Sequence, residues 1–292
     1  MQDNIINNKY LIQNHIGSGK FGNVFNGIYK KTNERIAIKV EDINAPFQLL
    51  KHEAKIMNML NINHCKYIPT VFWFGKFQNA MCLIIPYYSC SLEQYIKIKQ
   101  INNSQLNYLM IQMINILESI HTNCVIHRDI KPQNFMIKSG DLYLIDFGLS
   151  TFYINQDSCH IPNKHIDDII GNVKYVSYNI HNGHLPSRRD DLISIGYIYI
   201  YLHNHKLEWD NIIINKDLCI GIAELSNYKN EKRKEFKSWG RLSEVCSNIQ
   251  NQYKMNSECD KIKLSIYEYM QICYQYDYDE LPNYNEINNI FN

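Results

Sequence analysis

Cysteine motifs, targeting segments and an excess of one charge are all missing from this sequence of 292 residues. Its nine cysteines form no Cys-x-x-Cys pair and no cysteine–histidine spacing of the zinc type, so no zinc site is predicted. An odd, scattered set is typical of reduced thiols, so we expect the protein in the cytoplasm or nucleus, or in host cytoplasm if a virus encodes it. The N-terminal residues lack a basic region and an apolar stretch, so they do not predict a secretory signal.

Charge and hydropathy exclude two further classes. Thirty Lys and Arg against 29 Asp and Glu leave a net charge of +1, which gives no general attraction to nucleic acid or an anionic membrane. The longest apolar run, Ile193 to Leu202, is about half of a bilayer span, so we expect a buried helix there. A hydrophobic content of 45% supplies a core, and no repeat or Gly/Ser linker divides the chain. The sequence therefore predicts one large domain or two closely associated lobes, as a monomer.

The period of the apolar residues changes along the chain. Segments of period two, separated by Gly and Asn, predict antiparallel strands at 10–16, 22–29 and 36–40, with two more strands at 71–77 and 81–85. A helix is predicted from Pro46, which suits a first helical turn, with Phe47 on the apolar face. Beyond residue 90 helices dominate, over Leu106 to Ile120 and at 192–203, 217–238 and 261–277.

A glycine-rich segment, Gly17-Ser-Gly-Lys-Phe-Gly22-Asn-Val24, joins the first two predicted strands. Glycines let a backbone approach the oxygens of a polyphosphate, and free amides can point at its charge. A dinucleotide-binding loop would open a helix in a parallel βαβ unit, whereas this chain continues as a strand. On this segment alone, a plain glycine-rich hairpin stays open.

Lys39 ends the apolar run Ile36-Ala-Ile within the third predicted strand. An unpaired ammonium is costly among apolar neighbours, so the lysine needs a counter-charge. Glu53 in the next helix is the candidate, and such a pair would direct the lysine toward the α- and β-phosphates. A lysine that reaches solvent from an edge strand is the alternative.

The segment His-Arg-Asp129-Ile-Lys131-Pro-Gln-Asn134 is followed by Asp146-Phe-Gly. Phosphoryl transfer needs a carboxylate that orients the attacking hydroxyl and accepts its proton, a cation near the γ-phosphate, and oxygen ligands for Mg²⁺. Asp129, Lys131, and the pair of Asn134 with Asp146 supply these three functions. Their order after the glycine-rich loop and Lys39 predicts phosphoryl transfer.

Together these motifs resemble the eukaryotic protein kinase family, from Tyr10 to about Phe291. The resemblance implies an α+β fold of the bilobal protein-kinase type, with a small antiparallel β-sheet N-lobe that carries one main helix and a larger, mainly α-helical C-lobe. Residues 1–292 would form a single protein kinase domain. Its N-lobe would be 10–85, its hinge 86–90 and its C-lobe 91–292.

The resemblance also assigns site residues, position by position. The catalytic residues would be Asp129, Lys131, Lys39 and Glu53, and Asn134 and Asp146 would hold Mg²⁺. Ile85 would be the gatekeeper, followed by a hinge whose backbone meets adenine. The residues that contact ATP would be Ile16, Gly17, Ser18, Gly19, Lys20, Phe21, Gly22, Asn23, Val24, Ala37, Lys39, Ile85, Tyr88 and Met136.

Two later segments narrow the resemblance. Val176-Ser-Tyr-Asn179, where most kinases carry Ala-Pro-Glu, and Ser187-Arg-Arg-Asp-Asp191 resemble the casein kinase I group, with some likeness to the vaccinia-related kinase branch. In such a kinase Asp191 would accept hydrogen bonds from backbone amides of the catalytic loop.

The substrate loop departs from that group. Gly-Thr-Ala-Arg in the group is Gly-Asn172-Val-Lys174 here, so lysine replaces the bidentate fork of arginine. Asn172 would hydrogen-bond near Asp129 and Lys131. A basic run would either complete a phosphate-directed pocket or form a solvated helix face. The run consists of Lys229, Lys232, Arg233, Lys234 and Lys237.

The resemblance implies an ATP- and Mg²⁺-dependent protein serine/threonine kinase of the casein kinase I type. Lys131, two residues after Asp129, is similar to the Ser/Thr kinases. The partners would be protein substrates, acidic or already phosphorylated ones among them, rather than nucleic acid or membranes. Two alternatives remain: a pseudokinase scaffold that binds nucleotide without turnover, and a phosphotransferase that acts on small molecules.

Overall fold

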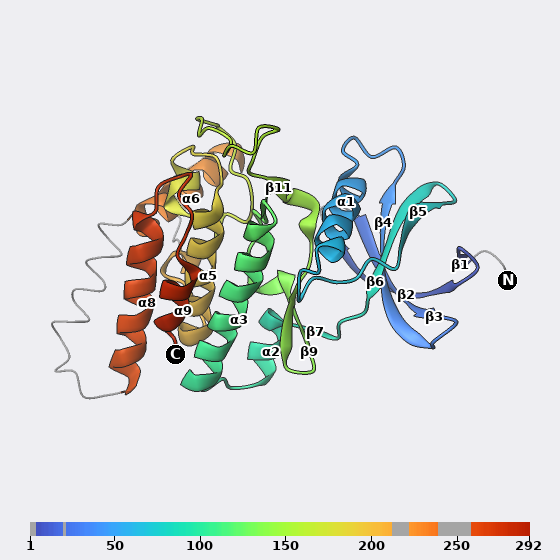
Figure 1. Cartoon of the computed structure of the whole chain (residues 1–292), viewed down its shortest axis with the longest axis horizontal. Helices are drawn as coiled ribbons and strands as arrows, with labels where there is room; N and C mark the ends of the chain where they lie inside the picture. The colour runs from blue at the N-terminus through green and yellow to red at the C-terminus, as the bar shows by residue number, and fades with distance from the viewer. Residues whose placement is uncertain (1–3, 20–21, 212–221, 239–257) are drawn as a thin grey trace. The chain divides into compact units, whose positions relative to one another are not determined.

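The computed structural model describes residues 4–19, 22–211, 222–238 and 258–292, and the chain folds into two compact units (Figure 1). Unit 1 consists of Met1–Tyr95 and Gln133–Thr151, and unit 2 consists of Ile96–Pro132 and Phe152–Asn292. The predicted lobe boundary lies where strands give way to helices along the sequence, whereas each of these units consists of the residues that pack together. The two divisions therefore differ over residues 86–95 and 133–151.

Unit 1 contains a six-stranded antiparallel sheet with the order β1-β2-β3-β4-β6-β5. Its strands are β1 (Ile5–Ile6), β2 (Tyr10–Gly19), β3 (Gly22–Tyr29), β4 (Glu34–Asp42), β5 (Trp73–Phe77) and β6 (Ala80–Pro86). The five predicted strands are thus confirmed, and β1 is an addition. A hydrophobic core lies against one face of the sheet. It consists of the buried residues Ile6, Tyr10, Ile36, Ile38, Cys82 and Ile84.

Helix α1 (Leu49–Ile62) packs against β4 and β6. The prediction that Pro46 occupies its first turn is wrong, because the helix begins three residues later. The buried carboxylate of Glu41 in β4 accepts hydrogen bonds from the amides of Leu49, at 3.1 Å, and Leu50, at 3.3 Å. This partner satisfies the first helical amides and fixes the start of the helix. Phe47 consequently lies before α1 and is 74% exposed.

A second, three-stranded sheet of unit 1 has the order β10-β9-β7. Its strands are β7 (Cys90–Ser91), β9 (Phe135–Lys138) and β10 (Asp141–Leu144). The remaining short elements of the chain are α2 (Leu92–Ile98), β8 (Val125–Ile126), η1 (Pro132–Asn134), η2 (Phe147–Leu149), β11 (Thr151–Phe152) and η3 (Glu208–Asn211). None of these short elements has an apolar period long enough to be seen in the sequence.

Unit 2 is built on α3 (Asn103–Thr122), which packs against α5 (Arg188–Asn204), and α5 packs in turn against α8 (Glu258–Gln275). Its other helices among the described residues are α4 (Tyr178–His181), α6 (Ile222–Lys237) and α9 (Tyr284–Asn289). The apolar run from residue 193 is buried within α5, as predicted. The predicted helix at 217–238 is α6, and residues 217–221 lie outside the described residues. Among the described helices, none is both long and apolar enough to cross a membrane.

Candidate active site

Lys39 in unit 1 is held by two carboxylates. Its Nζ donates to Glu53 Oε1 at 2.6 Å and to Asp146 Oδ1 at 3.2 Å. Burial alone would lower the pKa of Lys39, but the two carboxylates outweigh it and raise that pKa above its ordinary value. The lysine is therefore a charged group, and the predicted pairing with Glu53 is confirmed.

The register of the strands places three of the predicted ATP contacts, Val24, Ala37 and Ile85, on the same sheet face as Lys39. Ile36 and Ile38 enter the core, so Ala37 and Lys39 alternate to the other face of β4. Residues directly opposite each other in an antiparallel pair share a face, and Val24 lies opposite Lys39 while Ile85 lies opposite Ala37. Two other predicted contacts belong to the same unit: Tyr88 lies two residues after β6, and Met136 lies in β9.

The glycine-rich segment is the turn from β2 to β3, where Gly19 pairs with Gly22. Gly22 has a φ of +136°, and a Cβ at this position would lie 2.2 Å from the carbonyl oxygen of Val40. Only glycine fits there, because both the backbone angle and the close approach exclude a side chain. The continuation as strand β3 confirms that this loop does not open a helix. Lys20 and Phe21 lie outside the described residues.

Polar side chains brace the base of this turn. Ser18 Oγ donates to Asn23 Oδ1 at 2.8 Å, and His15 Nε2 lies 3.0 Å from Ser18 Oγ. Ile16 is 45% exposed, and a Cβ at Gly17 would meet nothing within 4 Å. The end of β2 thus presents open backbone at Gly17, which is what a polyphosphate requires.

Asp146 adopts an uncommon backbone conformation, with φ +71°. Non-glycine residues rarely occupy the left-handed region, and such strain gathers at functional sites. The next residue is also fixed, because the amide of Phe147 donates to Glu53 Oε1 at 3.3 Å. Glu53 therefore ties both Lys39 and the segment of Asp146 to α1.

Asn134 and Asp146 fit the predicted role in holding Mg²⁺. Asn134 is 4% exposed, and its backbone carbonyl accepts from the amide of Ile145 at 2.9 Å, directly before Asp146. Mg²⁺ prefers hard oxygen ligands and is usually bound by one or two protein groups together with substrate phosphates. A carboxylate and an amide oxygen from adjoining segments match that donor set.

Asp129 and Lys131 of unit 2 form a close pair. Lys131 Nζ donates to Asp129 Oδ2 at 2.6 Å, and Asp129 is 5% exposed. Arg128, which lies between β8 and Asp129, has a φ of +67°. Like Asp146, it is a residue of a predicted catalytic motif in the left-handed region. The hydrogen bond from Lys131 orients the carboxylate of Asp129.

Asp191 in α5 holds the catalytic loop, as predicted. Its carboxylate accepts from the amides of His127, at 2.7 Å, and Arg128, at 2.9 Å, and from His121 Nε2 at 3.1 Å. Burial would raise the pKa of Asp191, but the hydrogen bonds that it accepts, first of all the one from His121, outweigh burial and keep that pKa below its ordinary value. Asp191 is therefore a carboxylate that carries the loop.

His121 and Tyr284 extend this network and were not found from the sequence. Burial lowers the pKa of His121, so the imidazole is neutral at neutral pH. Its Nε2 donates to Asp191, and its Nδ1 accepts a hydrogen bond from the hydroxyl of Tyr284 at 2.6 Å. Helix α9 is thereby linked to the catalytic loop. No local pattern marks either residue, since the pair joins positions 163 residues apart.

The predicted substrate loop, which begins at residue 171, is folded around Asn172. The side-chain oxygen of Asn172 accepts a hydrogen bond from the amide of Lys174 at 3.0 Å, within the same loop. Lys174 Nζ lies 2.8 Å from Asp210 Oδ1 and 4.4 Å from the centre of the Tyr201 ring. Lys174, which stands where the casein kinase I group has arginine, is thus already paired with a carboxylate.

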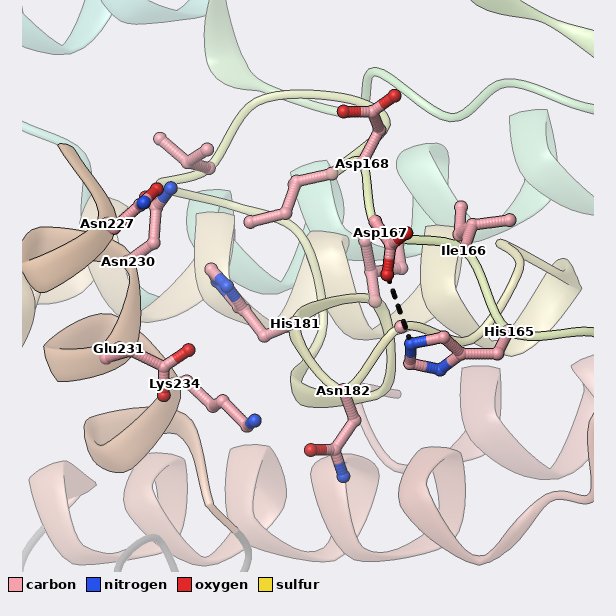
Figure 2. Close-up of a pocket in the computed structure, with 14 residues that line it drawn as sticks. His165, Ile166, Asp167, Asp168, His181, Asn182, Asn227, Asn230, Glu231 and Lys234 are labelled. Atoms are coloured by element: carbon pink, nitrogen blue, oxygen red, sulfur yellow. Dashed lines mark ion pairs between the residues drawn. The ribbon is translucent and has the colours of Figure 1, made fainter. Parts of the chain in front are cut away.

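The predicted basic run on α6 is divided between several roles. Lys237 is fully buried, so for this residue the expectations of an open pocket and of a solvated face are both wrong. Lys232 pairs with Glu235 at 2.8 Å. Lys234 lines a cavity of about 490 Å³, shown in Figure 2, to which α6 also contributes Asn227, Asn230 and Glu231. The other lining residues come from 165–183, among them His165, Asp167, Asp168, His181 and Asn182.

A family model described as the protein kinase domain matches residues 10–274. The chain belongs to the protein kinase family. The α+β fold of this kinase domain, with its antiparallel strands in the N-terminal region and helices in the C-terminal part, agrees with that match. Kinase domains generally use ATP and Mg²⁺ and act on protein substrates.

Proposed function

We propose that this kinase domain is an active, ATP- and Mg²⁺-dependent serine/threonine kinase of the casein kinase I type. The observation that carries the proposal is the contact of Lys39 with both Glu53 and Asp146. A pseudokinase scaffold typically lacks the lysine, the catalytic aspartate or the metal-binding aspartate, and this chain has all three. Two of them are also joined in one charged cluster.

The groups of the two units supply complementary parts of the reaction. In unit 1 the glycine-rich turn and Lys39 bind the phosphates of ATP, and Mg²⁺ bound by Asn134 and Asp146 would neutralise their charge. In unit 2 Asp129 orients the substrate hydroxyl and accepts its proton. The hydroxyl oxygen forms a bond to the γ-phosphorus as the bond to the β-phosphate oxygen breaks, and ADP leaves. Lys131 balances the charge beside Asp129.

The casein kinase I assignment is supported by contacts between its two diagnostic segments. Asp190 in α5 accepts from the hydroxyl of Ser177, from Asn179 Nδ2 at 3.3 Å and from the amide of Ser187 at 2.8 Å. Ser177 and Asn179 of the first segment and Ser187 of the second thus meet at one buried carboxylate. A small-molecule phosphotransferase has no need of this protein-kinase substrate segment, so we favour protein substrates.

A preference for acidic or already phosphorylated substrates stays a prediction. Two of its expected cations are engaged elsewhere, because Asp210 pairs with Lys174 and the loop carbonyls bind Lys237. A peptide pair with and without a phosphoserine three residues upstream of the target measures this preference directly.

The test uses purified protein with labelled ATP, Mg²⁺ and casein, followed by phosphoamino-acid analysis. We expect label on serine or threonine. A melting temperature that rises with ATP and Mg²⁺, without transfer to casein or to the protein itself, would instead establish the scaffold. Label on tyrosine alone would contradict the serine/threonine assignment.

A further inference from the structure

Lys237, the last residue of α6, is fully buried, which is rare for lysine. Its Nζ donates to the carbonyl oxygen of Val176 at 2.7 Å and to that of Val173 at 3.0 Å. Burial lowers the pKa of Lys237 well below its ordinary value. Both the ammonium and the neutral amine carry at least two N–H groups, so the amine can serve both carbonyls in either form.

Trp209 in η3 adds a third bond to the same stretch of backbone. Its Nε1 donates to the carbonyl oxygen of Lys174 at 2.8 Å, and its ring centre lies 5.0 Å from Lys237 Nζ. Three carbonyls within residues 173–176 are therefore held by side chains from two other elements. Buried carbonyls left unpaired are costly, so these donors fix the path of the loop.

The stretch that they hold adjoins the catalytic loop. Gly171 has a φ of +106°, and a Cβ there would lie 2.3 Å from the carbonyl oxygen of Arg128, next to Asp129. The amides of Tyr175 and Val176 turn back to the carbonyl of Asn172, at 2.8 and 2.9 Å. Residues 171–176 are thus one compact turn, packed at one end on the catalytic loop and tied at the other to Lys237 and Trp209.

The same turn forms part of the cavity lining in Figure 2. Val173 and His181 line that cavity, and His181 Nε2 lies 3.3 Å from Lys237 Nζ. Burial, and next the charge of Lys237, lower the pKa of His181 to about 3, so its ring is neutral at neutral pH. Lys237 is itself buried, but through its contacts with Val173 and His181 it fixes part of the wall of this cavity.

We propose that Lys237, with Trp209, is a positioning residue that fixes the substrate loop 171–176 and thereby governs binding of the protein substrate rather than of ATP. The inference rests on the proposed kinase function. Lys237 touches neither substrate nor nucleotide, and its effect passes through the carbonyls of the loop. The residues assigned to ATP all belong to unit 1, whereas this arrangement lies wholly in unit 2.

The experiment compares the full chain with Lys237→Met, which keeps the length of the side chain and removes the donors, and with Trp209→Phe, which keeps an aromatic ring and removes one donor. The exposed Lys206→Met is the matched control. We expect the KM for a peptide substrate to rise about tenfold in Lys237→Met and less in Trp209→Phe, with the KM for ATP within twofold of wild type. Lys206→Met should match wild type in both.

Hydrogen exchange of the amides of Tyr175 and Val176 supplies a readout that does not depend on activity. We expect faster exchange in both loop variants and no change in the control. Equal losses of kcat with an unchanged peptide KM would overturn the inference, as would unchanged exchange. If Lys237→Met does not fold, Trp209→Phe decides by the same two measurements. If the wild-type protein transfers no phosphate, the proposed function fails, and exchange alone decides whether these residues hold the loop.

Discussion

Replacing Asp191 by Asn tests how the catalytic loop is held. The carboxylate accepts three hydrogen bonds: Oδ2 from the amide of His127 and from His121, and Oδ1 from the amide of Arg128. An asparagine keeps one acceptor oxygen. If that oxygen takes the place of Oδ2, two bonds survive and the new NH₂ group faces the amide of Arg128, donor against donor.

The magnitude follows from this geometry. A hydrogen bond to a charged group contributes about 1.5 to 3 kcal/mol, and a buried amide left unpaired costs about 1 to 3 kcal/mol. We therefore expect Asp191→Asn to lower the free energy of unfolding by about 3 kcal/mol. For a chain of this size that corresponds to a fall in melting temperature of roughly 6 to 12 °C. Because the loop carries Asp129, kcat should fall more than the KM for ATP changes.

The assay pairs thermal unfolding, followed by circular dichroism, with steady-state kinetics on casein. Asp157→Asn, at an exposed position, is the matched control and should resemble wild type. A melting temperature within 1 °C of wild type together with an unchanged kcat for Asp191→Asn would refute the reasoning.

Three further predictions concern unit 2. Gly171→Ala should lower kcat, and it should lower the free energy of unfolding, measured in urea, by about 1 to 3 kcal/mol. The reason is that the φ of Gly171 is positive and an added Cβ would meet the carbonyl oxygen of Arg128. Since the pKa of His181 is about 3 in the folded chain and about 6.5 when unfolded, stability should fall by up to about 1.4 kcal/mol per pH unit below about 6.5, and His181→Asn should flatten that slope. Tyr284→Phe should cost about 1 kcal/mol by losing its bond to His121, and an unchanged melt would contradict this.

Features that depend on local pattern or on a compulsory partner could be predicted from the sequence. The strands 10–16, 22–29 and 36–40 followed from period-two spacing, and the partner of Lys39 followed from the cost of an unpaired charge in a strand. The bonds that Asp191 accepts from the catalytic loop followed from the resemblance.

Features that depend on distant contacts could not be predicted. The start of α1 is set by Glu41, which lies in the preceding strand β4, and its carboxylate reaches the first amides of the helix only once strand and helix pack together. Lys237 belongs to a basic run for which the sequence left a phosphate-directed pocket and a solvated helix face open, yet its Nζ is buried and binds the carbonyls of Val173 and Val176. Asp210, which pairs with Lys174, is 36 residues away along the chain. In each case the partner is brought close only by tertiary packing.

The proposed reaction has two parts: binding of ATP, which we assign to groups within unit 1, and transfer of the phosphoryl group, which we assign to Asp129 within unit 2. Lys39, Glu53 and Asp146 form a charged cluster, to which the proposal gives the binding of ATP, whereas Asp129 is buried beside Lys131, and the proposal gives it the substrate hydroxyl. Removing a group of the first kind should weaken both nucleotide binding and turnover. Removing Asp129 should affect turnover alone.

Asp129→Asn is therefore the most direct measurement. Wild-type and variant proteins are compared for ATP binding, by thermal shift with Mg²⁺, and for transfer of labelled phosphate to casein. We expect equal shifts with nucleotide and a transfer rate lower by about 10² to 10⁴ in the variant, the range for loss of a group that handles a proton in the transition state. Equal rates of transfer by the two proteins would contradict the assignment of Asp129 and the mechanism built on it.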